Sequence, residues 1–478
     1  MNTVKKIAKN TAVVFISQIF IYAISFIYII VAARYLGTNG FGIISQAMAL
    51  TGILVIFADM GINYLIVREV ARDKSLTEKY LGNSLTIKLI LTLVTVIMTI
   101  IIVNYLNYDN TTTLVIYLFL ISVIFNSFSS MFYSIFQAYE KMEYISVGQL
   151  MGTIGVLIGT LLTVFFQLGI ISFTLTYVIS NLIALIYAFY LCSNKYTLPK
   201  IKFDLTFWNK TIKEAIPFGL TTLSIVAYSS IDIIILSLIQ GNDVVGWYNA
   251  AYKLLSVFIL IPVAFNSAIF PVMSQFHVTS YNSLDKLFKK YFKYMIIVGI
   301  PLGIGTTLLA NNIIPLIYGE SYILSSIALQ ILIWYIVIYF ARASFERLFE
   351  STNKQRSLTI VFGLFVIFNL LLNLITIPSY SFIGAAFSRV ITELGIFSVI
   401  IILGLRYGHN VLDKDIILTF PKVLISAGLM GIFIMLFKDL NLFVLVTVST
   451  ILYFTILLII KGFNNKEIDI FLNFLPFK

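Results

Sequence analysis

Charged side chains inside long apolar runs are the residues of this sequence whose types could do chemistry. Five are cationic and four are anionic: Asp59, Lys88, Asp232, Lys253, Arg342, Glu346, Arg347, Arg389 and Glu393. A charge surrounded by hydrocarbon costs several kcal/mol unless it is paired or hydrated, so such residues face a bundle interior or a water-filled cavity. These residues therefore mark candidate sites for a charged substrate or an ion.

Four cations are the candidate ligands for an anionic substrate: Arg34, Lys253, Arg342 and Arg389. Arginine can bind a phosphate through two parallel hydrogen bonds, whereas lysine acts as a point charge. Arg34 and Lys253 have no carboxylate within four residues on their own helix, which favours them as ligands. Lys88 and Arg347 lie close enough to the cytoplasmic face to extend their charged ends into water.

Four carboxylates are the candidate ion-pairing or coupling residues: Asp59, Asp232, Glu346 and Glu393. Glu346 lies four residues after Arg342, and Glu393 lies four residues after Arg389, so each couple can pair along one helix. Each couple is either a self-neutralising structural pair or part of a site. We expect no bound cofactor and no metal; a coupling ion, if one is used, would be Na⁺ or H⁺.

Asp232 and Lys253 lie on consecutive predicted helices. Counted from the helix ends, both are roughly 10 to 12 Å below the outer surface at about 1.5 Å of rise per residue. We therefore expect them to pair. Either Lys253 binds a headgroup phosphate when the site is loaded and returns to Asp232 when it is empty, or the pair is purely structural.

Other kinds of site lack the residues that they need. Cys192 is the only cysteine, and His277 and His409 are too few and too far apart for a ligand cluster. No Walker-type phosphate loop is present, which argues against direct ATP hydrolysis. The formal net charge of +11 lies in short loops rather than on one basic face, so nucleic acid is not an expected partner.

The elements that must position the embedded charges are membrane helices. Hydrophobic residues make up 60% of the chain and charged residues 11%, with a mean hydropathy of +0.99, so the fold class is an all-α polytopic membrane protein. Runs long enough for a bilayer of about 30 Å predict fourteen transmembrane helices. They cover residues 11–33, 41–66, 84–105, 114–138, 144–167, 172–192, 216–240, 246–271, 291–310, 324–349, 358–378, 382–406, 416–437 and 441–460.

Alternate loops between these runs differ in positive charge. One set holds 24 lysines and arginines, whereas the other holds Arg34 and Lys438. The positive-inside rule places the richer set, together with the N and C termini, in the cytoplasm. We therefore expect a multi-pass protein of the plasma (inner) membrane.

The chain also repeats itself after 204 residues. That shift places Gly37 on Gly241 and Gly42 on Gly246, with twelve identities over positions 5 to 51. Two parallel six-helix repeats, with two extra C-terminal helices, follow from this spacing. The predicted domains are residues 1–200 (N-terminal lobe), 201–410 (C-terminal lobe) and 411–478 (two additional helices and a cytoplasmic tail).

Backbone breakers and amphipathic segments complete the pattern. Gly37, Gly42, Gly241 and Gly246 predict two tight turns, and prolines inside two helices, Pro262 and Pro301, are either hinges or static kinks. The segment 281–295 has one apolar face and one lysine-rich face, so we expect it to lie on the membrane surface against anionic headgroups. Residues 203–215 and the end of the chain are weaker examples. For all three, a connector without direct function is the alternative.

Four motifs resemble, in chain order, the oligosaccharide flippases of the polysaccharide biosynthesis family. They are RYLGTNGFG at 34–42, FADMGIN at 57–63, REVAR at 68–72 and PLIYGESY at 315–322. That family belongs to the superfamily shared with MATE multidrug exporters and lipid II flippases. The resemblance implies a two-lobed bundle whose central cavity opens alternately to each side and moves a polyprenyl-(di)phosphate-linked glycan to the outer leaflet. Such cavities are commonly lined by cations, whereas the embedded charges here are nearly balanced.

Two other functions compete with flipping. A MATE-like antiporter would use the four carboxylates to exchange a cationic drug for Na⁺ or H⁺. A membrane enzyme of glycan assembly, such as a polymerase, ligase or glycosyltransferase, would need an acid–base constellation that the loops do not show, so an enzyme is not expected. The expected partners are the lipid-linked glycan and anionic lipid headgroups, with glycan-assembly enzymes as further candidates, around a monomeric transporter.

Overall fold

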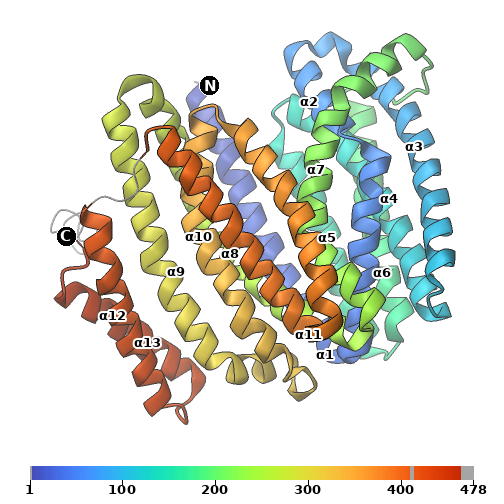
Figure 1. The fold of residues 1–478 in the computed structure, drawn as a ribbon. Helices are drawn as coiled ribbons and strands as arrows, with labels where there is room; N and C mark the ends of the chain where they lie inside the picture. The colour runs from blue at the N-terminus through green and yellow to red at the C-terminus, as the bar shows by residue number, and fades with distance from the viewer. Residues whose placement is uncertain (1–2, 410–413, 464–478) are drawn as a thin grey trace. The chain divides into compact units, whose positions relative to one another are not determined.

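The protein is helical throughout the part of the chain that its structure describes. The computed structural model describes residues 3–409 and 414–463, and the predicted cytoplasmic tail from 464 onward lies outside these residues. Within them there are α-helices and two short 3-10 turns and no strand (Figure 1). The predicted all-α class is confirmed.

Thirteen α-helices make up these residues, and twelve spans among them are long and apolar enough to cross a membrane. The exception is the short amphipathic helix α2. The elements are α1 (Thr3–Asp59), α2 (Ile62–Arg72), η1 (Lys74–Leu76), α3 (Thr77–Leu106), α4 (Asn110–Ala138), α5 (Met142–Phe165), α6 (Gly169–Lys195), α7 (Leu205–Ile239), α8 (Asn242–Thr279), α9 (Tyr281–Tyr318), η2 (Glu320–Tyr322), α10 (Ser325–Ser351), α11 (Gln355–Arg406), α12 (Lys414–Leu436) and α13 (Leu442–Ile459).

Two of the helices are each a pair of helices joined by a sharp kink. Gly37 has φ 67° and ψ −176° inside α1, and Ser381 has φ 54° and ψ −139° inside α11. Dividing both helices turns the twelve spans into fourteen segments, which correspond to the fourteen predicted runs. The predicted run 41–66 is an exception at its end, because α1 stops at Asp59 and residues 62–66 belong to α2. The number of membrane crossings and the orientation of the termini remain predictions.

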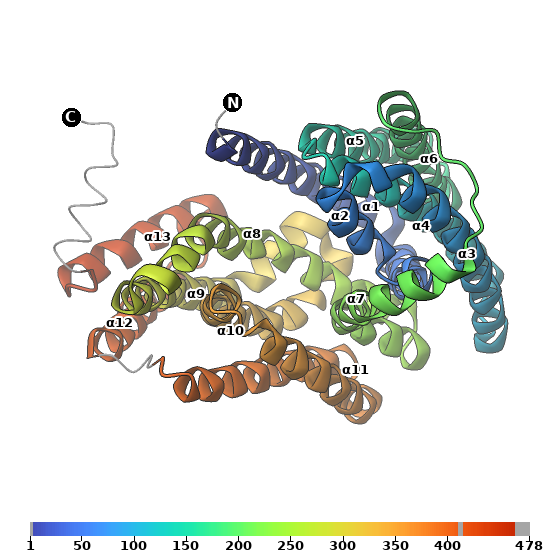
Figure 2. The same ribbon diagram turned by 90° about the horizontal axis from the view of Figure 1, so that it is seen from above.

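The chain forms two compact units, Met1–Asn249 and Ala250–Lys478, so the division falls inside α8. In the first unit, α4 packs on α6 and α1 packs on α5. In the second unit, α10 packs between α9 and α11, while α12 covers α9 and pairs with α13 (Figure 2). The predicted domain boundaries near 200 and 410 rest on the sequence repeat and remain predictions.

Side-chain hydrogen bonds cap the N-termini of α7 and α9. The Asp204 carboxylate accepts a hydrogen bond from the backbone N–H of Phe207 at 2.9 Å, and the Ser280 hydroxyl accepts one from Ser283 N–H. Each cap satisfies one of the N–H groups that a helix leaves open at its first turn. These caps fix the starts of α7 and α9.

The two amphipathic segments are not separate surface helices, which corrects the expectation for both. Residues 281–295 are the first turns of α9, which runs on to Tyr318, and residues 205–215 are the first turns of α7. No proline or glycine separates Met295 from the apolar run that follows, so the helical hydrogen bonds continue through it. Pro262 and Pro301 likewise lie within continuous α8 and α9, and a hinge at either remains a prediction.

Candidate functional site

The two repeated glycine turns pack against each other inside the first unit. Gly37 and Gly241 have φ 67° and φ 87°, a left-handed conformation that glycine adopts without strain. A Cβ on Gly42 would lie 1.8 Å from the Asn242 carbonyl oxygen, so only glycine permits this approach. A Cβ on Gly246 would lie 2.2 Å from the Thr38 carbonyl oxygen. The 204-residue shift relates Thr38 to Asn242, so the two close approaches are equivalent.

Polar side chains reinforce this glycine-turn contact, which we define as residues 38–45 with 242–249. Asn39 Nδ2 donates to Asp243 Oδ2 at 3.1 Å, and the Thr38 hydroxyl donates to the same carboxylate. Deeper in the contact, Asn249 Nδ2 donates to Ser45 Oγ at 2.5 Å, and both residues are buried. Ser45 and Asn249 are themselves related by the 204-residue shift. The contact is therefore nearly two-fold symmetric and closes one end of the seam between α1 and α7.

A buried ion pair joins α1 to α3 in the same unit. Lys88 Nζ lies 2.7 Å from Asp59 Oδ1, and the lysine side chain is 0% exposed. We expected Lys88 to extend to the membrane surface, and that is wrong, because the Asp59 carboxylate gives its ammonium a partner inside the bundle. The pair joins two helices, so helical spacing could not show it.

In the second unit, one arginine holds two carboxylates. Arg342 Nε donates to Glu393 Oε1 at 2.5 Å, and Arg342 Nη1 donates to Glu346 on the next turn of α10. Exposure is 5% for the Arg342 side chain and 0% for that of Glu393. The guanidinium carbon also lies about 5 Å from the ring centres of Tyr339 and Phe362. We call Arg342, Glu346 and Glu393 the carboxylate triad; two anions face one cation in it.

Arg389 has a different environment one turn away on α11. Its Nη2 donates to the Tyr252 hydroxyl at 2.9 Å, and its guanidinium carbon lies 5.3 Å and 5.1 Å from the ring centres of Tyr252 and Tyr335. The side chain is 1% exposed. Ring faces attract and orient a guanidinium without carrying a compensating charge. These contacts therefore hold the Arg389 guanidinium in place.

A ladder of small polar side chains positions this part of α11. Asn373 Nδ2 donates to Asn369 Oδ1 at 3.0 Å, and Asn369 Nδ2 donates to Thr392 Oγ1 at 3.0 Å. The Thr376 and Ser388 hydroxyls lie 2.8 Å apart. These bonds join the segments before and after the kink at Ser381, which fixes the rotation of the helix that carries Arg389 and Glu393. Sequence reasoning missed the ladder, although two asparagines four residues apart in an apolar run are a usable signal.

Three predicted site residues lie outside the networks described above: Asp232, Lys253 and Arg34. Asp232 is buried in the first unit, where it accepts a hydrogen bond from the Tyr248 hydroxyl at 2.7 Å. Lys253 is half-buried in the second unit, and Arg34 is exposed on α1. Since Asp232 and Lys253 belong to different units, their pairing remains a prediction.

Long apolar helices that hold ion pairs and arginines inside each unit define a multi-pass membrane protein with buried charge networks. This chain belongs to the family described as polysaccharide biosynthesis protein, whose sequence profile matches residues 7–277. A second profile, MatE, matches residues 217–375.

Curated relatives cover most of the chain. A putative O-antigen transporter of Shigella dysenteriae is 29% identical over 67% of this chain and 80% of that protein. A probable low-salt glycan biosynthesis flippase, Agl15 of Haloferax volcanii, is 22% identical over 80% of this chain and 79% of that protein. The resemblance that the motifs predicted is confirmed at the level of the family.

Solved structures share the fold at low sequence identity. The lipid II flippase MurJ in an inward closed conformation matches with a TM-score of 0.76 at 16% identity, covering 94% of this chain and 98% of that one. An inward-facing multidrug resistance MATE family transporter matches with a TM-score of 0.66 at 14% identity, covering 81% and 94%. The fold is therefore that of the superfamily named from the motifs.

Proposed function

We propose that this protein moves an oligosaccharide linked to a polyprenyl phosphate or diphosphate from the cytoplasmic to the outer leaflet of the plasma membrane, for assembly of a cell-surface glycan. Family membership and relatives named as an O-antigen transporter and a glycan biosynthesis flippase support this proposal. The same relatives support transport rather than catalysis. The lipid-linked glycan is the substrate, and glycan-assembly enzymes would supply and consume it.

The observation that carries the proposal is the environment of Arg389. A phosphate group that crosses hydrocarbon needs a fixed positive partner, and a planar guanidinium can give a phosphate two hydrogen bonds. Arg389 is buried, and its guanidinium is oriented by Tyr252 and Tyr335. Arg342 already holds two carboxylates, so we assign it to positioning and retain Arg389, with Lys253 and Arg34, as phosphate ligands.

Alternating access needs a contact between helices that can open and close as a unit. The glycine-turn contact is suited to this role, because close backbone approaches and a few hydrogen bonds cross it. We place it on the outer side from the loop charges. Its closed form then corresponds to a cavity shut toward the outside.

Export of surface glycan in a strain that lacks its own flippase tests this function. Arg389→Ala should lower surface glycan about tenfold or more, because hydrogen bonds to a charged group contribute about 1.5–3 kcal/mol. Arg389→Lys keeps the charge and should retain part of the activity. The exposed Arg356→Ala is the matched control and should export at the wild-type level. Wild-type export by Arg389→Ala, at equal membrane abundance, would remove Arg389 from the site.

A cation or drug antiporter is the second candidate function. The MatE profile matches residues 217–375, and the carboxylate triad has one more anion than cation, as a site for Na⁺ or H⁺ would require. Drug susceptibility in a host without its own pumps separates the two functions. Resistance that depends on Glu346 and Glu393, with no glycan export, would favour the antiporter.

A further inference from the structure

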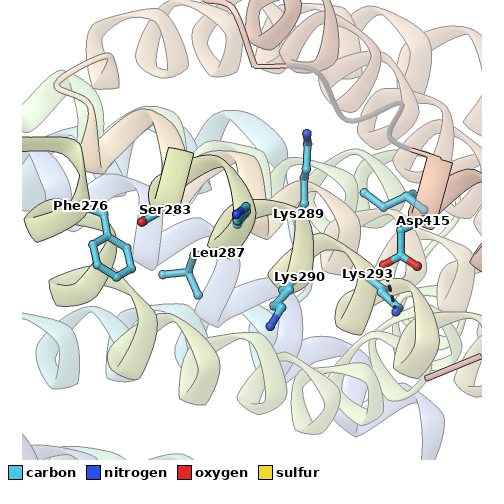
Figure 3. Close-up of a pocket in the computed structure, with 9 residues that line it drawn as sticks. Phe276, Ser283, Leu287, Lys289, Lys290, Lys293 and Asp415 are labelled. Carbon is cyan, nitrogen blue, oxygen red and sulfur yellow. Dashed lines mark hydrogen bonds and ion pairs between the residues drawn. The ribbon is translucent and has the colours of Figure 1, made fainter. Parts of the chain in front are cut away.

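A lysine-lined pocket lies on the second unit, at the end predicted to face the cytoplasm. It encloses about 420 Å³ between the end of α8, the start of α9 and the start of α12 (Figure 3). Its charged lining residues are Lys286, Lys289, Lys290, Lys293 and Asp415. None of these residues belongs to the triad or to the surroundings of Arg389, so the proposed transport site does not account for the pocket.

One stripe along α9 holds three of these lysines, Lys286, Lys290 and Lys293. They are spaced four and three residues apart, so they lie on the same face of successive helical turns. Figure 3 shows Lys290 and Lys293 on one side of the helix and the neighbouring Lys289 directed away from them. Lys289 instead pairs with Asp285 at 2.7 Å. The stripe therefore concentrates positive charge along one wall of the pocket.

Charge in the pocket is only partly compensated. Lys293 is 2% exposed, and its Nζ lies 3.3 Å from Asp415 Oδ2. Lys286 and Lys290 are exposed, and neither forms an ion pair with any residue in the described part of the chain. With Asp285, the partner of Lys289, included, the pocket holds four lysines and two carboxylates. Such a site favours an anion of one or two charges.

The opposite face of the same turns anchors the lysines. Leu284, Phe288 and Tyr291 are at most 1% exposed, so the start of α9 is fixed to the unit by its apolar face. Phe276 and Leu287 line the pocket beside the lysines. An apolar wall next to a fixed cationic stripe fits a ligand that is itself amphiphilic. Lysines at a membrane face attract anionic headgroups by about 1 kcal/mol each.

We propose that this pocket binds the phosphate headgroup of an anionic membrane lipid, with Lys286 and Lys290 as its ligands and Lys293, held by Asp415, as the inner end of the site. The lipid's acyl chains would remain in the bilayer beside Phe276 and Leu287. This site is separate from the glycan pathway and does not depend on which substrate the protein carries.

Lipid binding to the purified full-length protein tests the proposal directly. Phosphatidylglycerol and phosphatidylcholine of the same acyl chains are titrated, and bound lipid is counted by native mass spectrometry. The wild-type protein should retain phosphatidylglycerol preferentially. The variant Lys286→Gln/Lys290→Gln should bind it about thirtyfold more weakly, since it loses two lysines, with no change for phosphatidylcholine.

A charge-matched control distinguishes lipid binding at this pocket from general electrostatic attraction of the lipid to the protein. Lys141→Gln/Lys200→Gln removes two exposed lysines of the first unit and should leave phosphatidylglycerol binding unchanged. An equal loss in both double variants would overturn the proposal. Inorganic pyrophosphate tests the other source of phosphate: if it binds the wild-type protein through Lys286 and Lys290 while phosphatidylglycerol shows no preference over phosphatidylcholine, the ligand is a soluble phosphate and the lipid proposal is wrong.

Discussion

At the scale of single residues, the role of each embedded charged side chain depends on the side chains that contact it. Arg342 and Arg389 lie on helices that pack together, yet the first holds Glu346 and Glu393 whereas the second contacts Tyr252 and the ring of Tyr335. A guanidinium between two carboxylates has little attraction left for a phosphate, whereas aromatic rings orient a guanidinium without carrying a compensating charge. The two arginines are therefore expected to differ in mutational phenotype.

Removing Arg342 should destabilise the protein rather than specifically impair transport. Arg342→Met removes the cation that both buried carboxylates contact, and breaking a buried ion pair costs about 3–5 kcal/mol. We expect a large loss of folded protein in the membrane and a lower melting temperature after purification. Adding Glu346→Gln and Glu393→Gln to Arg342→Met should restore much of both, because no uncompensated charge remains.

The adjacent Arg347 supplies the control for this experiment. It pairs with Glu350 at 2.7 Å, and its side chain is 27% exposed, so Arg347→Met should cost at most about 1 kcal/mol. A melting temperature for Arg342→Met equal to that of Arg347→Met would show that the triad contributes little to stability.

At the scale of elements, the repeated turns become one contact. Each turn alone is a short connection between helices, but glycines at 42 and 246 let the two backbones approach within a distance that a Cβ would block. Asn39 donates to Asp243 across the contact, and Asn249 donates to Ser45 in the opposite direction; each bond joins two residues that the 204-residue shift relates. The repeat thus gives the first unit a self-complementary seam.

Locking this seam should stop transport. The side chains of Asn39 and Asp243 are in hydrogen-bond contact, so Asn39→Cys/Asp243→Cys should form a disulfide on mild oxidation. The buried native Cys192 should not interfere. We expect glycan export to fall close to background when the pair is oxidised and to recover on reduction, with either single-cysteine variant unaffected. Full export by cross-linked protein would mean that the seam does not open during transport.

At the scale of the whole molecule, the loop charges predict one orientation for all the spans. Lys438 lies in a connection of the charge-poor set and Asn353 in one of the charge-rich set, so they should face opposite sides of the membrane. Both positions are exposed. This orientation also decides which leaflet meets the lysine-lined pocket.

Cysteine labelling tests the orientation. In intact cells, a membrane-impermeant maleimide should react with Lys438→Cys, and it should react with Asn353→Cys only after the membrane is permeabilised. Buried Cys192 should give little background. The reverse pattern would place the termini outside and the glycine-turn contact on the cytoplasmic side.

The sequence by itself determined the class, the family and the positions of the breaks. Apolar runs predict the membrane helices, because backbone groups in hydrocarbon must form their hydrogen bonds within the same segment. The length and hydropathy of each run are therefore sufficient to identify a helix. Short sequence spacing also predicted the Arg342–Glu346 pair, whose members are four residues apart on one helix, and the turn at Gly37. The start of α9 was also predicted as helical, although its continuity with the following span was missed.

Only the tertiary structure decided which embedded charges meet. Lys88 pairs with Asp59 from another helix, Glu393 pairs with Arg342 across α10 and α11, and Arg389 is held by Tyr252 of α8. Helical spacing gives the face that a residue occupies on its own helix but not the rotation of the neighbouring helix, which depends on packing, on the kink at Ser381 and on the polar ladder of α11. Charge balance read from the sequence therefore could not show which arginine is compensated, because compensation is a property of contacts between helices.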